Sequence, residues 1–412
     1  MARDRVLAMI LAGGKGHRLE PLTRERSKPS VPFGGRYRIV DFVLSNFVNS
    51  RILSLYVLVQ YKSQSLIEHL RMAWQTSGLV PDHFIAVVPP QMRIGEMWYR
   101  GSADAVLQNL NLVDDFEPDL VAVFGADHIY RMDVNQMVAF HRAHEADVTV
   151  AARPVPVSEA SSFGVLTADA TGRVIEFVEK PKVPRAMRGH PRHALSSMGN
   201  YLFSRRALVE ALVADARQPT DHDFGKSIIP ALVPTARVFA YDFQGNTVPG
   251  IKPYEEPGYW RDVGTIDAYW RAHMDLLGET PSFDLDNRRW PIHAARYDGP
   301  PARIIGGEFE NAQVGEGALV LRATIRNSIL GRGVWVNEGA VIEDSIVMDF
   351  TSVGKGAHLR RAIVDRYNII PAGQQLGLDP AADRERYRVD PSGLVVVPRG
   401  GRRDFFWNTE DP

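Results

Sequence analysis

Glycines and cationic side chains lie close together in one stretch near the start of the chain. Residues 6–11 are apolar and precede the glycines, a pattern typical of a fully buried parallel strand. Gly13, Gly14 and Gly16 then allow the backbone to turn tightly and to approach a ligand closely. The cations in the same segment are Lys15, Arg18 and Lys28. Because the net charge of the chain is only −1, this local positive charge predicts a polyanionic ligand such as a nucleoside triphosphate.

Two other glycine motifs do not match this stretch. A Walker loop ends in Gly-Lys-Ser/Thr five residues after a first glycine, and the chain has no such string. A dinucleotide-binding fingerprint requires a glycine where Leu19 stands. A glycine-rich surface turn remains the alternative, and the neighbouring cations and the motifs further along the chain disfavour it.

Two aspartates are candidates for binding a metal ion. Asp127 follows the apolar run 120–124, which places it at the carboxyl end of a predicted parallel strand, where open α/β sheets bind ligands. Asp262 precedes a predicted helix over 265–277, for which Thr265 is a suitable N-cap. Mg²⁺ prefers carboxylate and phosphate oxygens, and two aspartates can share one ion. The alternative for each residue alone is a loop or helix cap.

Residues further along the chain offer contacts for a second, phosphorylated ligand. Glu179 and Lys180 end a predicted strand at 174–178, and a lysine suits phosphate whereas a glutamate suits sugar hydroxyl groups. Aromatic and small side chains at 98–105 lead into a predicted helix over 105–113, and aromatic rings stack on bases. The alternatives are a solvated strand end and a packed aromatic corner.

Three other patterns are interpreted as coincidental or structural. The Asp-Phe-Gly triplet at 223–225 matches the metal-binding triplet of protein kinases, but the other kinase motifs are absent. His141 and His144 have helical spacing, and histidines on helix surfaces are usually not metal ligands. Glu255 and Glu256 are predicted to be a solvated charge pair.

The elements that position these residues follow an α/β pattern in the first part of the chain. Strand-like apolar runs lie at 6–11, 56–59, 120–124 and 148–152. Helical periodicity separates them, as at 132–145, and this alternation predicts a parallel sheet. A hairpin with strands at 164–166 and 174–178 follows, so we expect a smaller mixed sheet inserted over about 153–260.

A repeat begins after a proline-punctuated linker at 286–300. Its glycine clusters start at residues 314, 336, 353 and 370, and inward-facing apolar residues are expected at 330, 336, 342, 347, 353 and 359. This six-residue period predicts a three-sided parallel β-helix with coils close to 18 residues, rather than a β-sandwich. We therefore predict a catalytic domain over 1–285 and a β-helix over 301–412, whose faces or ends form subunit contacts.

Length and composition limit the class of protein. A chain of 412 residues with 45% hydrophobic and 24% charged residues is ordinary for a globular protein of two or three domains. It shows neither a membrane-spanning run nor the apolar core of a signal peptide, so we expect a cytoplasmic protein without membrane partners. The absence of cysteine restricts metal ligands to oxygen and nitrogen. The near-neutral charge argues against nucleic-acid binding.

Taken in order, these motifs resemble the bacterial glucose-1-phosphate adenylyltransferases, also called ADP-glucose pyrophosphorylases. The segments that carry the resemblance are 11–19, 27–29, 33–35, 38–42, 98–105, 125–130, 177–181, 197–201, 223–226 and 260–265. The resemblance implies an α/β nucleotidyltransferase domain with a Rossmann-like, mostly parallel sheet, followed by a left-handed parallel β-helix. It also implies a homotetramer.

The activity implied by the resemblance is transfer of the adenylyl group of ATP to α-D-glucose 1-phosphate. The products are ADP-glucose, the glucosyl donor for glycogen and other α-glucans, and pyrophosphate, and the implied cofactor is Mg²⁺. Because the acceptor is already a phosphate anion, alignment and charge neutralisation are expected to matter more than a strong general base.

The resemblance also implies roles for individual residues. Those for nucleotide binding are Leu11, Ala12, Gly13, Gly14, Lys15, Gly16, Lys28, Gln60, Tyr99, Gly101 and Asp127. Those for glucose 1-phosphate are Tyr99, Gly164, Glu179, Lys180, Ser197 and Asp262. The catalytic group is Arg18, Lys28, Asp127 and Asp262, and the two aspartates would hold the metal ion.

Two segments depart from the family pattern. Lys-Gly-His at 15–17 stands where the family often has Arg-Gly-Thr, and the lysine preserves a phosphate-binding cation. Glu25 stands where some relatives have an activator-binding lysine, which reverses the charge and weighs against a sugar bisphosphate activator. Arg24, Arg26 and Arg36 remain candidates for binding an anionic effector between the domains.

Three alternative functions stay open. One is a pyrophosphorylase that uses UTP, GTP or dTTP, since base choice depends on pocket chemistry. A second is a non-catalytic regulatory subunit, against which the retained Lys28, Asp127 and Lys180 argue. A third is a β-helix acyltransferase, which usually needs more coils and a catalytic histidine, and His358 is the only histidine of the repeat.

Overall fold

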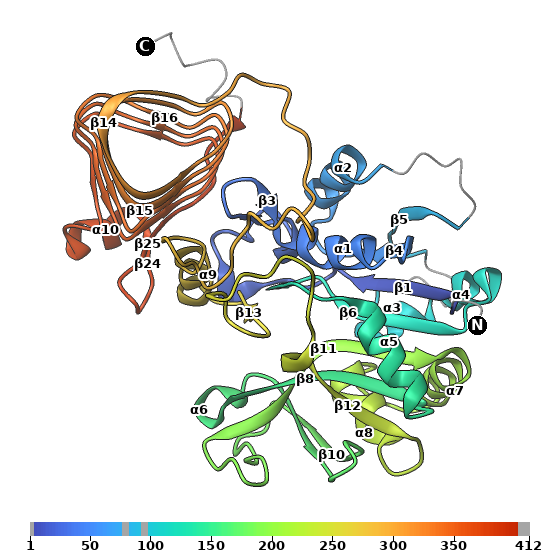
Figure 1. The fold of residues 1–412 in the computed structure, drawn as a ribbon. Coiled ribbons are helices and arrows are strands. Elements are labelled where there is room, and N and C mark those ends of the chain that lie inside the picture. The colour runs from blue at the N-terminus through green and yellow to red at the C-terminus, as the bar shows by residue number, and fades with distance from the viewer. Residues whose placement is uncertain (1–3, 76–81, 92–97, 403–412) are drawn as a thin grey trace.

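A mixed sheet forms the centre of the first domain in the computed structural model, which describes residues 4–75, 82–91 and 98–402 (Figure 1). The strands in spatial order are β10 (Val174–Glu179), β9 (Gly164–Ala168), β11 (His193–Ser204), β6 (Leu120–Gly125), β1 (Val6–Leu11), β4 (Ser54–Leu58) and β5 (Phe84–Val88). The strands β6, β1, β4 and β5 run parallel. The apolar runs predicted the first three, whereas no predicted run covers β5. The antiparallel β11 connects them to β8 (Val148–Pro156), which pairs with β12 (Val238–Asp242).

Helices cover both faces of this sheet because successive side chains of a strand point to opposite faces. Ala8 and Ile10 of β1 pack into one apolar core, whereas Leu7 and Met9 pack into the other. Helices α1 (Ile39–Asn49), α2 (Gln64–Ala73) and α5 (Val134–Ala143) contribute to the first core. Helices α3 (Ser102–Leu107), α4 (Leu110–Phe116) and α7 (Arg205–Ala216) contribute to the second.

The single helix predicted over 105–113 is wrong, because α3 ends before α4 begins. Asn109 causes the break: its backbone N–H bonds to Val106, and its side chain donates to the carbonyl of Ala105 at 2.8 Å. The same amide group donates to the hydroxyl of Tyr99 at 2.9 Å. A side chain that competes for a helical carbonyl in this way commonly interrupts a helix.

The predicted hairpin and helix cap after residue 150 are confirmed. Strands β9 and β10 pair antiparallel, with Gly164 opposite Glu179. Thr265 caps α9 (Ile266–Met274) by accepting from the backbone of Ala268, although the helix ends before residue 277.

The shorter elements are β2 (Pro32–Phe33), β3 (Tyr37–Arg38), β7 (His128–Tyr130), α6 (Val157–Ala160), the π-helix η3 (Phe224–Ile228), α8 (Ile229–Leu232) and β13 (Trp260–Asp262), with 3-10 turns η1 (His17–Leu19), η2 (Lys28–Ser30) and η4 (Phe243–Gly245).

The solvated pair predicted at 255 and 256 is wrong for Glu255, which is buried. Its carboxylate lies 2.7 Å from Arg131 and accepts backbone N–H groups of Lys252 and Asp284. A buried carboxylate requires such partners. Glu255 therefore connects Asp284, just before the linker, to Arg131, which directly follows β7.

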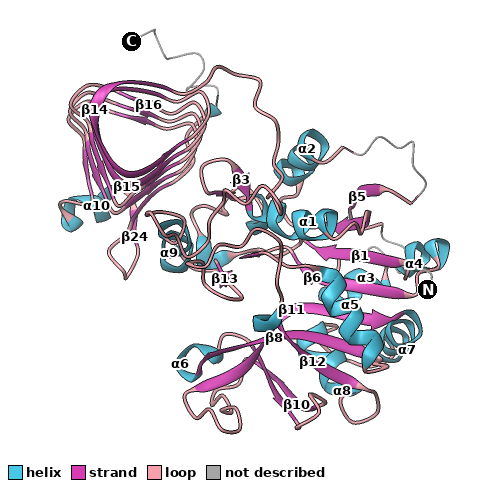
Figure 2. Ribbon diagram, viewed as in Figure 1, coloured by secondary structure: helices cyan, strands magenta, loops and turns pink. Residues whose placement is uncertain are grey.

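A parallel β-helix forms the second domain, and its triangular cross-section is seen nearly end-on in Figures 1 and 2. Its strands are β14 (Arg303–Val314), β15 (Leu319–Leu330), β16 (Trp335–Val336), β17 (Val341–Glu343), β18 (Ile346–Val347), β19 (Ser352–Val353), β20 (His358–Arg360), β21 (Ala362–Val364), β22 (Ile369–Ile370), β23 (Gln375–Leu376), β24 (Arg388–Val389) and β25 (Val395–Val397), with α10 (Pro380–Arg386). All six apolar positions predicted to face inward are buried.

Each coil is slightly shorter than the predicted 18 residues. Arg303 pairs with Leu319 and Trp335 with Ser352, so successive coils are offset by 16 and then 17 residues. The reason is visible in the inward positions, because Ile342 and Val347 are five residues apart rather than six. The repeat nevertheless excludes the β-sandwich.

The two domains share a continuous apolar core. Phe33 and Tyr269 of the first domain pack in the same cluster as Ile346 of the β-helix. A buried ion pair crosses the boundary, in which Arg26 donates to Asp365 at 2.7 Å. Within the described residues, no helix is long and apolar enough to cross a membrane.

Candidate active site

A cavity of about 560 Å³ opens at the carboxyl edge of the parallel strands. Leu11, Leu58 and Gly125, the last residues of β1, β4 and β6, all line it. This edge is where open α/β sheets bind ligands. The other lining residues are Gly13, Gly14, Lys28, Pro29, Gln60, Tyr99, Gly101, Ser102, Ala105, Asp127, Glu179, Lys180, Gly199, Tyr201, Asp223, Phe224 and Gly225.

The glycine loop forms one wall of the cavity. A Cβ atom at Gly14 would have no heavy atom within 4 Å, so the backbone faces open space there. Gly16 has a left-handed backbone with φ of 67°, which a side chain would disfavour. Thr23 donates to the carbonyl of Gly16 at 2.9 Å and holds the loop against the segment that carries Lys28. The loop is thus fixed at its far end and open toward the cavity.

Lys28 bridges the two predicted metal ligands. Its ammonium lies 2.7 Å from Asp262 and 3.1 Å from Asp127, and its side chain is only 7% exposed. Burial by itself lowers the pKa of Lys28, but the two carboxylates outweigh it and raise that pKa above the ordinary value. Burial likewise acts to raise the pKa of Asp127, and the adjacent His128 and Lys28 outweigh it and lower that pKa. The ion-paired forms are therefore stabilised.

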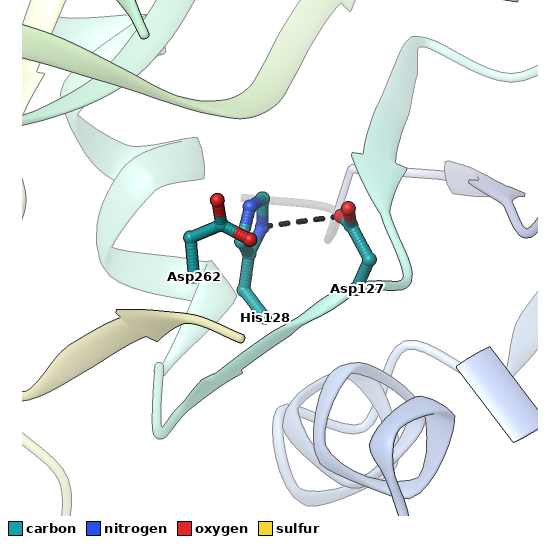
Figure 3. Close-up of side chains that lie close together, drawn as sticks. All are labelled: Asp127, His128 and Asp262. Carbon is teal, nitrogen blue, oxygen red and sulfur yellow. Dashed lines mark ion pairs between the residues drawn. The ribbon is translucent and has the colours of Figure 1, made fainter. Parts of the chain in front are cut away.

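Asp127, His128 and Asp262 also form a group that could hold a metal ion (Figure 3). One ligand atom from each lies within 4.8 Å of the others. The Nδ1 atom of His128 is 3.5 Å from Asp127 and has no hydrogen-bond partner among the described residues. Two carboxylates and an imidazole suit a divalent cation. Sequence reasoning missed His128, although it directly follows Asp127.

A short antiparallel ribbon brings these residues together. Strand β7 pairs with β13 so that His128 lies opposite Asp262. The ring of His128 packs on Trp260, with centroids 4.8 Å apart. Arg153 of β8 donates to the carbonyls of Gly258 and Trp260 at 3.0 and 3.2 Å, which holds the ribbon from the other side.

The opposite wall of the cavity comes from the hairpin and from η3. Glu179 lies 3.3 Å from the ammonium of Lys180. A Cβ atom at Gly225 would lie 2.5 Å from the Glu179 carboxylate, and one at Gly164 would lie 2.8 Å from it. Both glycines therefore leave room for this carboxylate. Gly164 does not itself line the cavity in the described structure.

The triplet at 223–225 lies in this wall. Asp223 caps η3 by accepting from the backbone of Gly225 and Lys226. Ser102 donates to the Asp223 carboxylate at 2.7 Å and connects η3 to α3. The triplet has no kinase role here, and only its inclusion among the family segments pointed to the site.

The other predicted residues border the cavity. Ala12 is buried behind the loop, and the Lys15 side chain is exposed. Arg18 lies 3.8 Å from Asp262 with a side chain that is 61% exposed. Ser197 is buried and accepts from the backbone of Gly199, which does line the cavity.

Comparison with known proteins identifies the family. A nucleotidyl transferase family model matches residues 7–279, and a GlmU-like C-terminal hexapeptide model matches residues 300–397. The chain is 54% identical to the glucose-1-phosphate adenylyltransferase of Thermodesulfovibrio yellowstonii over 97% of both chains. The chain belongs to the glucose-1-phosphate adenylyltransferase family. Members from Anaeromyxobacter sp. and Photobacterium profundum are 51% and 46% identical, over 97% and 96% of this chain and 99% and 98% of theirs.

Membership of the glucose-1-phosphate adenylyltransferases confirms the resemblance drawn from the motifs. It also confirms the order of the two domains, a mostly parallel nucleotidyltransferase sheet followed by a left-handed hexapeptide β-helix. The acyltransferase alternative is excluded, because members of this family are nucleotidyltransferases.

Gly101 offers a test of the wall geometry. A Cβ atom there would collide with the carbonyl oxygens of Asp221 and His222. We expect Gly101→Ala to lower the free energy of unfolding by about 1–3 kcal/mol, as overpacking does. Gly14→Ala is the matched control, and its effect should stay below about 1 kcal/mol. Thermal unfolding of the two variants measures this difference, and equal midpoints would contradict the geometry.

Proposed function

We propose that this chain transfers the adenylyl group of ATP to α-D-glucose 1-phosphate, giving ADP-glucose and pyrophosphate. The observation that carries the proposal is the single cavity that joins the open glycine loop, the Lys28 bridge and the wall with Glu179 and Lys180. One end offers backbone and cations for a triphosphate, and the other offers a carboxylate and a cation for a phosphorylated sugar. Relatives named glucose-1-phosphate adenylyltransferase, which are similar to this chain over nearly their full length, support the assignment.

The nucleotide would lie along the glycine loop. Gly13, Gly14, Lys15, Gly16, Arg18 and Lys28 would contact the triphosphate, and Leu11, Ala12, Gln60, Tyr99 and Gly101 would border the adenosine. The amide of Gln60 accepts from the backbone N–H of Tyr99 at 2.8 Å and donates to its carbonyl at 3.3 Å. These two hydrogen bonds hold the segment just after β4 against Tyr99, which would border the base.

The sugar phosphate would occupy the opposite wall. Lys180 would pair with its phosphate and Glu179 would accept from sugar hydroxyl groups, with Tyr99, Gly164, Ser197 and Asp262 around them. An acceptor oxygen of this phosphate would form a bond to the α-phosphorus of ATP as the bond to pyrophosphate breaks. The residues act mainly by aligning the two phosphates and neutralising their charge.

Mg²⁺ is the proposed cofactor, with Asp127 and Asp262 as its protein ligands and His128 beside them. The residues fit, because a hard divalent cation prefers carboxylate oxygens and substrate phosphates. When bound, the ion would supply charge neutralisation at the phosphates. A cytoplasmic location remains a proposal.

Nucleotide choice and the role of Asp127 can be tested in one assay. Purified protein receives Mg²⁺, glucose 1-phosphate and ATP, UTP, GTP or dTTP in turn, and pyrophosphate release is followed. We expect the highest rate with ATP, and we expect Asp127→Asn to lose several orders of magnitude in turnover with an unchanged thermal midpoint. A preference for UTP would overturn the adenylyl assignment, inactivity with all four would favour a regulatory subunit, and a near-normal rate for Asp127→Asn would remove it as a ligand.

We also propose that anionic metabolites regulate the enzyme at a cavity of about 630 Å³ between the domains. Seven arginines line it: Arg36, Arg38, Arg296, Arg332, Arg366, Arg399 and Arg402. The lining carboxylates are Glu25, Glu68, Asp298 and Asp349. Burial and the positive charges of Arg366 and Arg26 lower the pKa of Arg38 to about 9. An anion bound there would relieve this crowding of charge.

Of the three arginines suggested by the sequence, Arg36 lines this cavity. Arg24 and Arg26 border a smaller adjoining cavity, and Arg26 is committed to its ion pair with Asp365. Glu25 lines both cavities and lies 3.4 Å from Arg399. Its carboxylate therefore pairs with the Arg399 guanidinium, which would otherwise be available to an anionic effector.

Arg366 provides the test of regulation. It is buried, and its Nε atom has no hydrogen-bond partner among the described residues. We expect sugar phosphates or inorganic phosphate to change the rate of the wild type, and Arg366→Gln to raise the half-saturating concentration about tenfold. Arg322→Gln, which removes a surface arginine paired with Glu338, is the control. No change in the wild-type rate at any effector concentration would reject the regulatory proposal.

We propose a homotetramer, for which the open end of the β-helix offers one of the subunit contacts. Strand β14 pairs with β15, and no other strand of the described residues covers its second edge. Ile304, Ile305 and Phe309 are 51%, 41% and 37% exposed on it. A long apolar edge strand is normally covered, and a second copy of the chain would cover it.

Charge placed on β14 tests this contact. We expect the double variant Ile304→Glu, Phe309→Glu to sediment as a smaller species than the wild type, because burial of a carboxylate in a subunit contact is unfavourable. Ile175→Glu, at an exposed apolar side chain of β10, is the control. An unchanged sedimentation coefficient would exclude β14 as a subunit contact.

A further inference from the structure

The position of Lys28 restricts what else can lie between the two aspartates. Its ammonium contacts one carboxylate oxygen of Asp262 at 2.7 Å and one of Asp127 at 3.1 Å. The ligand atoms of Asp127, His128 and Asp262 are within 4.8 Å of one another. A Mg²⁺ ion coordinated by both carboxylates would stand about 2.0–2.1 Å from an oxygen of each, and therefore beside the ammonium that contacts the same two groups. Bound together, the two cations would be close neighbours in one small group of charges and would repel each other.

We infer that the Lys28 ammonium and the divalent cation compete for the carboxylates of Asp127 and Asp262, so that the cation binds tightly only when the nucleotide triphosphate takes over the ammonium. This inference rests on the proposed function. It makes Lys28 the residue that couples metal binding to nucleotide binding. Without the triphosphate, Lys28 neutralises the two aspartates itself.

The structure provides a second position for the ammonium. Lys28 lines the same cavity as Gly13 and Gly14, and a Cβ atom at Gly16 would lie 3.1 Å from the Lys28 Cβ. The base of the side chain therefore rests against the glycine loop. Rotation of the flexible four-carbon chain can turn the ammonium from the aspartates toward phosphates on that loop without movement of the backbone. Pro29 directly after it, in the short turn η2, keeps the base in place.

The balance of charge favours replacement of the ammonium by the divalent cation only when the triphosphate is also present. Two carboxylates together with one ammonium carry a charge near −1, and Arg18 at 3.8 Å from Asp262 reduces the local field further. A divalent cation entering this group meets an ammonium at contact distance, which is a strong repulsion in a buried site. A triphosphate supplies anionic oxygens for the ammonium and ligands for the cation. By linkage, each ligand then raises the affinity of the other by the same factor.

Direct binding of Mn²⁺ tests the competition without relying on catalysis. The full-length protein is titrated with Mn²⁺ alone, and the free ion is measured by electron paramagnetic resonance. We expect Lys28→Met and the second neutral variant Lys28→Gln to bind Mn²⁺ about tenfold or more tightly than the wild type, in the range of ordinary coupling between sites. Lys28→Arg keeps a cation and should stay near the wild type.

Lys15→Met is the matched control for a general effect of charge. It removes one lysine from the same glycine loop, and no ion pair joins Lys15 to Asp127 or Asp262 in the described structure. We expect its Mn²⁺ affinity to stay within about twofold of the wild type, because an exposed charge is screened. Equal gains in Mn²⁺ affinity for Lys15→Met and Lys28→Met would indicate a general effect of charge rather than competition at the contact. That result would overturn the inference.

A second titration, with Mn²⁺ and α,β-methylene ATP together, separates this inference from the proposed function. Binding of Mn²⁺ to the wild type in the presence of the nucleotide would support the metal site. If, in addition, Lys28→Met and Lys28→Gln bind Mn²⁺ alone no better than the wild type, the competition is rejected and the metal site stands. If no protein binds Mn²⁺ under either condition, or if Asp127→Asn leaves binding unchanged, the proposed metal site itself is rejected. Thermal midpoints identify any variant that fails to fold, and either neutral variant of Lys28 suffices.

Discussion

The antiparallel pairing of β7 with β13 is the constraint on which the site depends. It places Asp262 beside Asp127, although nearly half of the first domain lies between them in the chain. A two-stranded ribbon is only marginally stable in isolation. Here the tilted packing of the His128 ring against Trp260 stabilises the pairing, and two hydrogen bonds from Arg153 of β8 hold the ribbon against the large sheet. Without this pairing, Lys28 would have no pair of carboxylates to bridge.

The segment from Gly13 to Lys28 connects the cavity at the carboxyl edge of the sheet to the boundary between the domains. Arg26 and Lys28 are two residues apart, yet Arg26 pairs with Asp365 of the β-helix and Lys28 pairs with Asp127 and Asp262. Burying an ion pair costs desolvation, so the Arg26 pair is better understood as holding the domains in position than as a large source of stability. The arginine-lined cavity begins beside this pair. The proposed regulatory and catalytic sites thus share one short stretch of backbone.

Local patterns predicted the elements well where a hydrophobic period was long and regular. The run at 6–11 became a central strand, and all six positions that the six-residue period predicted to face inward are buried in the β-helix. The single helix over 105–113 failed because the side chain of Asn109 competes for the Ala105 carbonyl, a contact that no periodicity records. Glu255 was assigned to solvent because its buried partner Arg131 lies far away in the chain.

The sequence alone determined the character of the site: a glycine loop with cations, two aspartates after strands or before helices, and a carboxylate and a lysine at a hairpin end. These features depend on residue types and short spacings, which are visible in the sequence itself. Tertiary structure decided which of them meet. It brought Asp262 to Asp127 and His128, placed the triplet 223–225 in the wall beside Glu179, and gathered seven arginines between the domains. Those contacts depend on strand register and domain packing over long chain separations, which no local pattern contains.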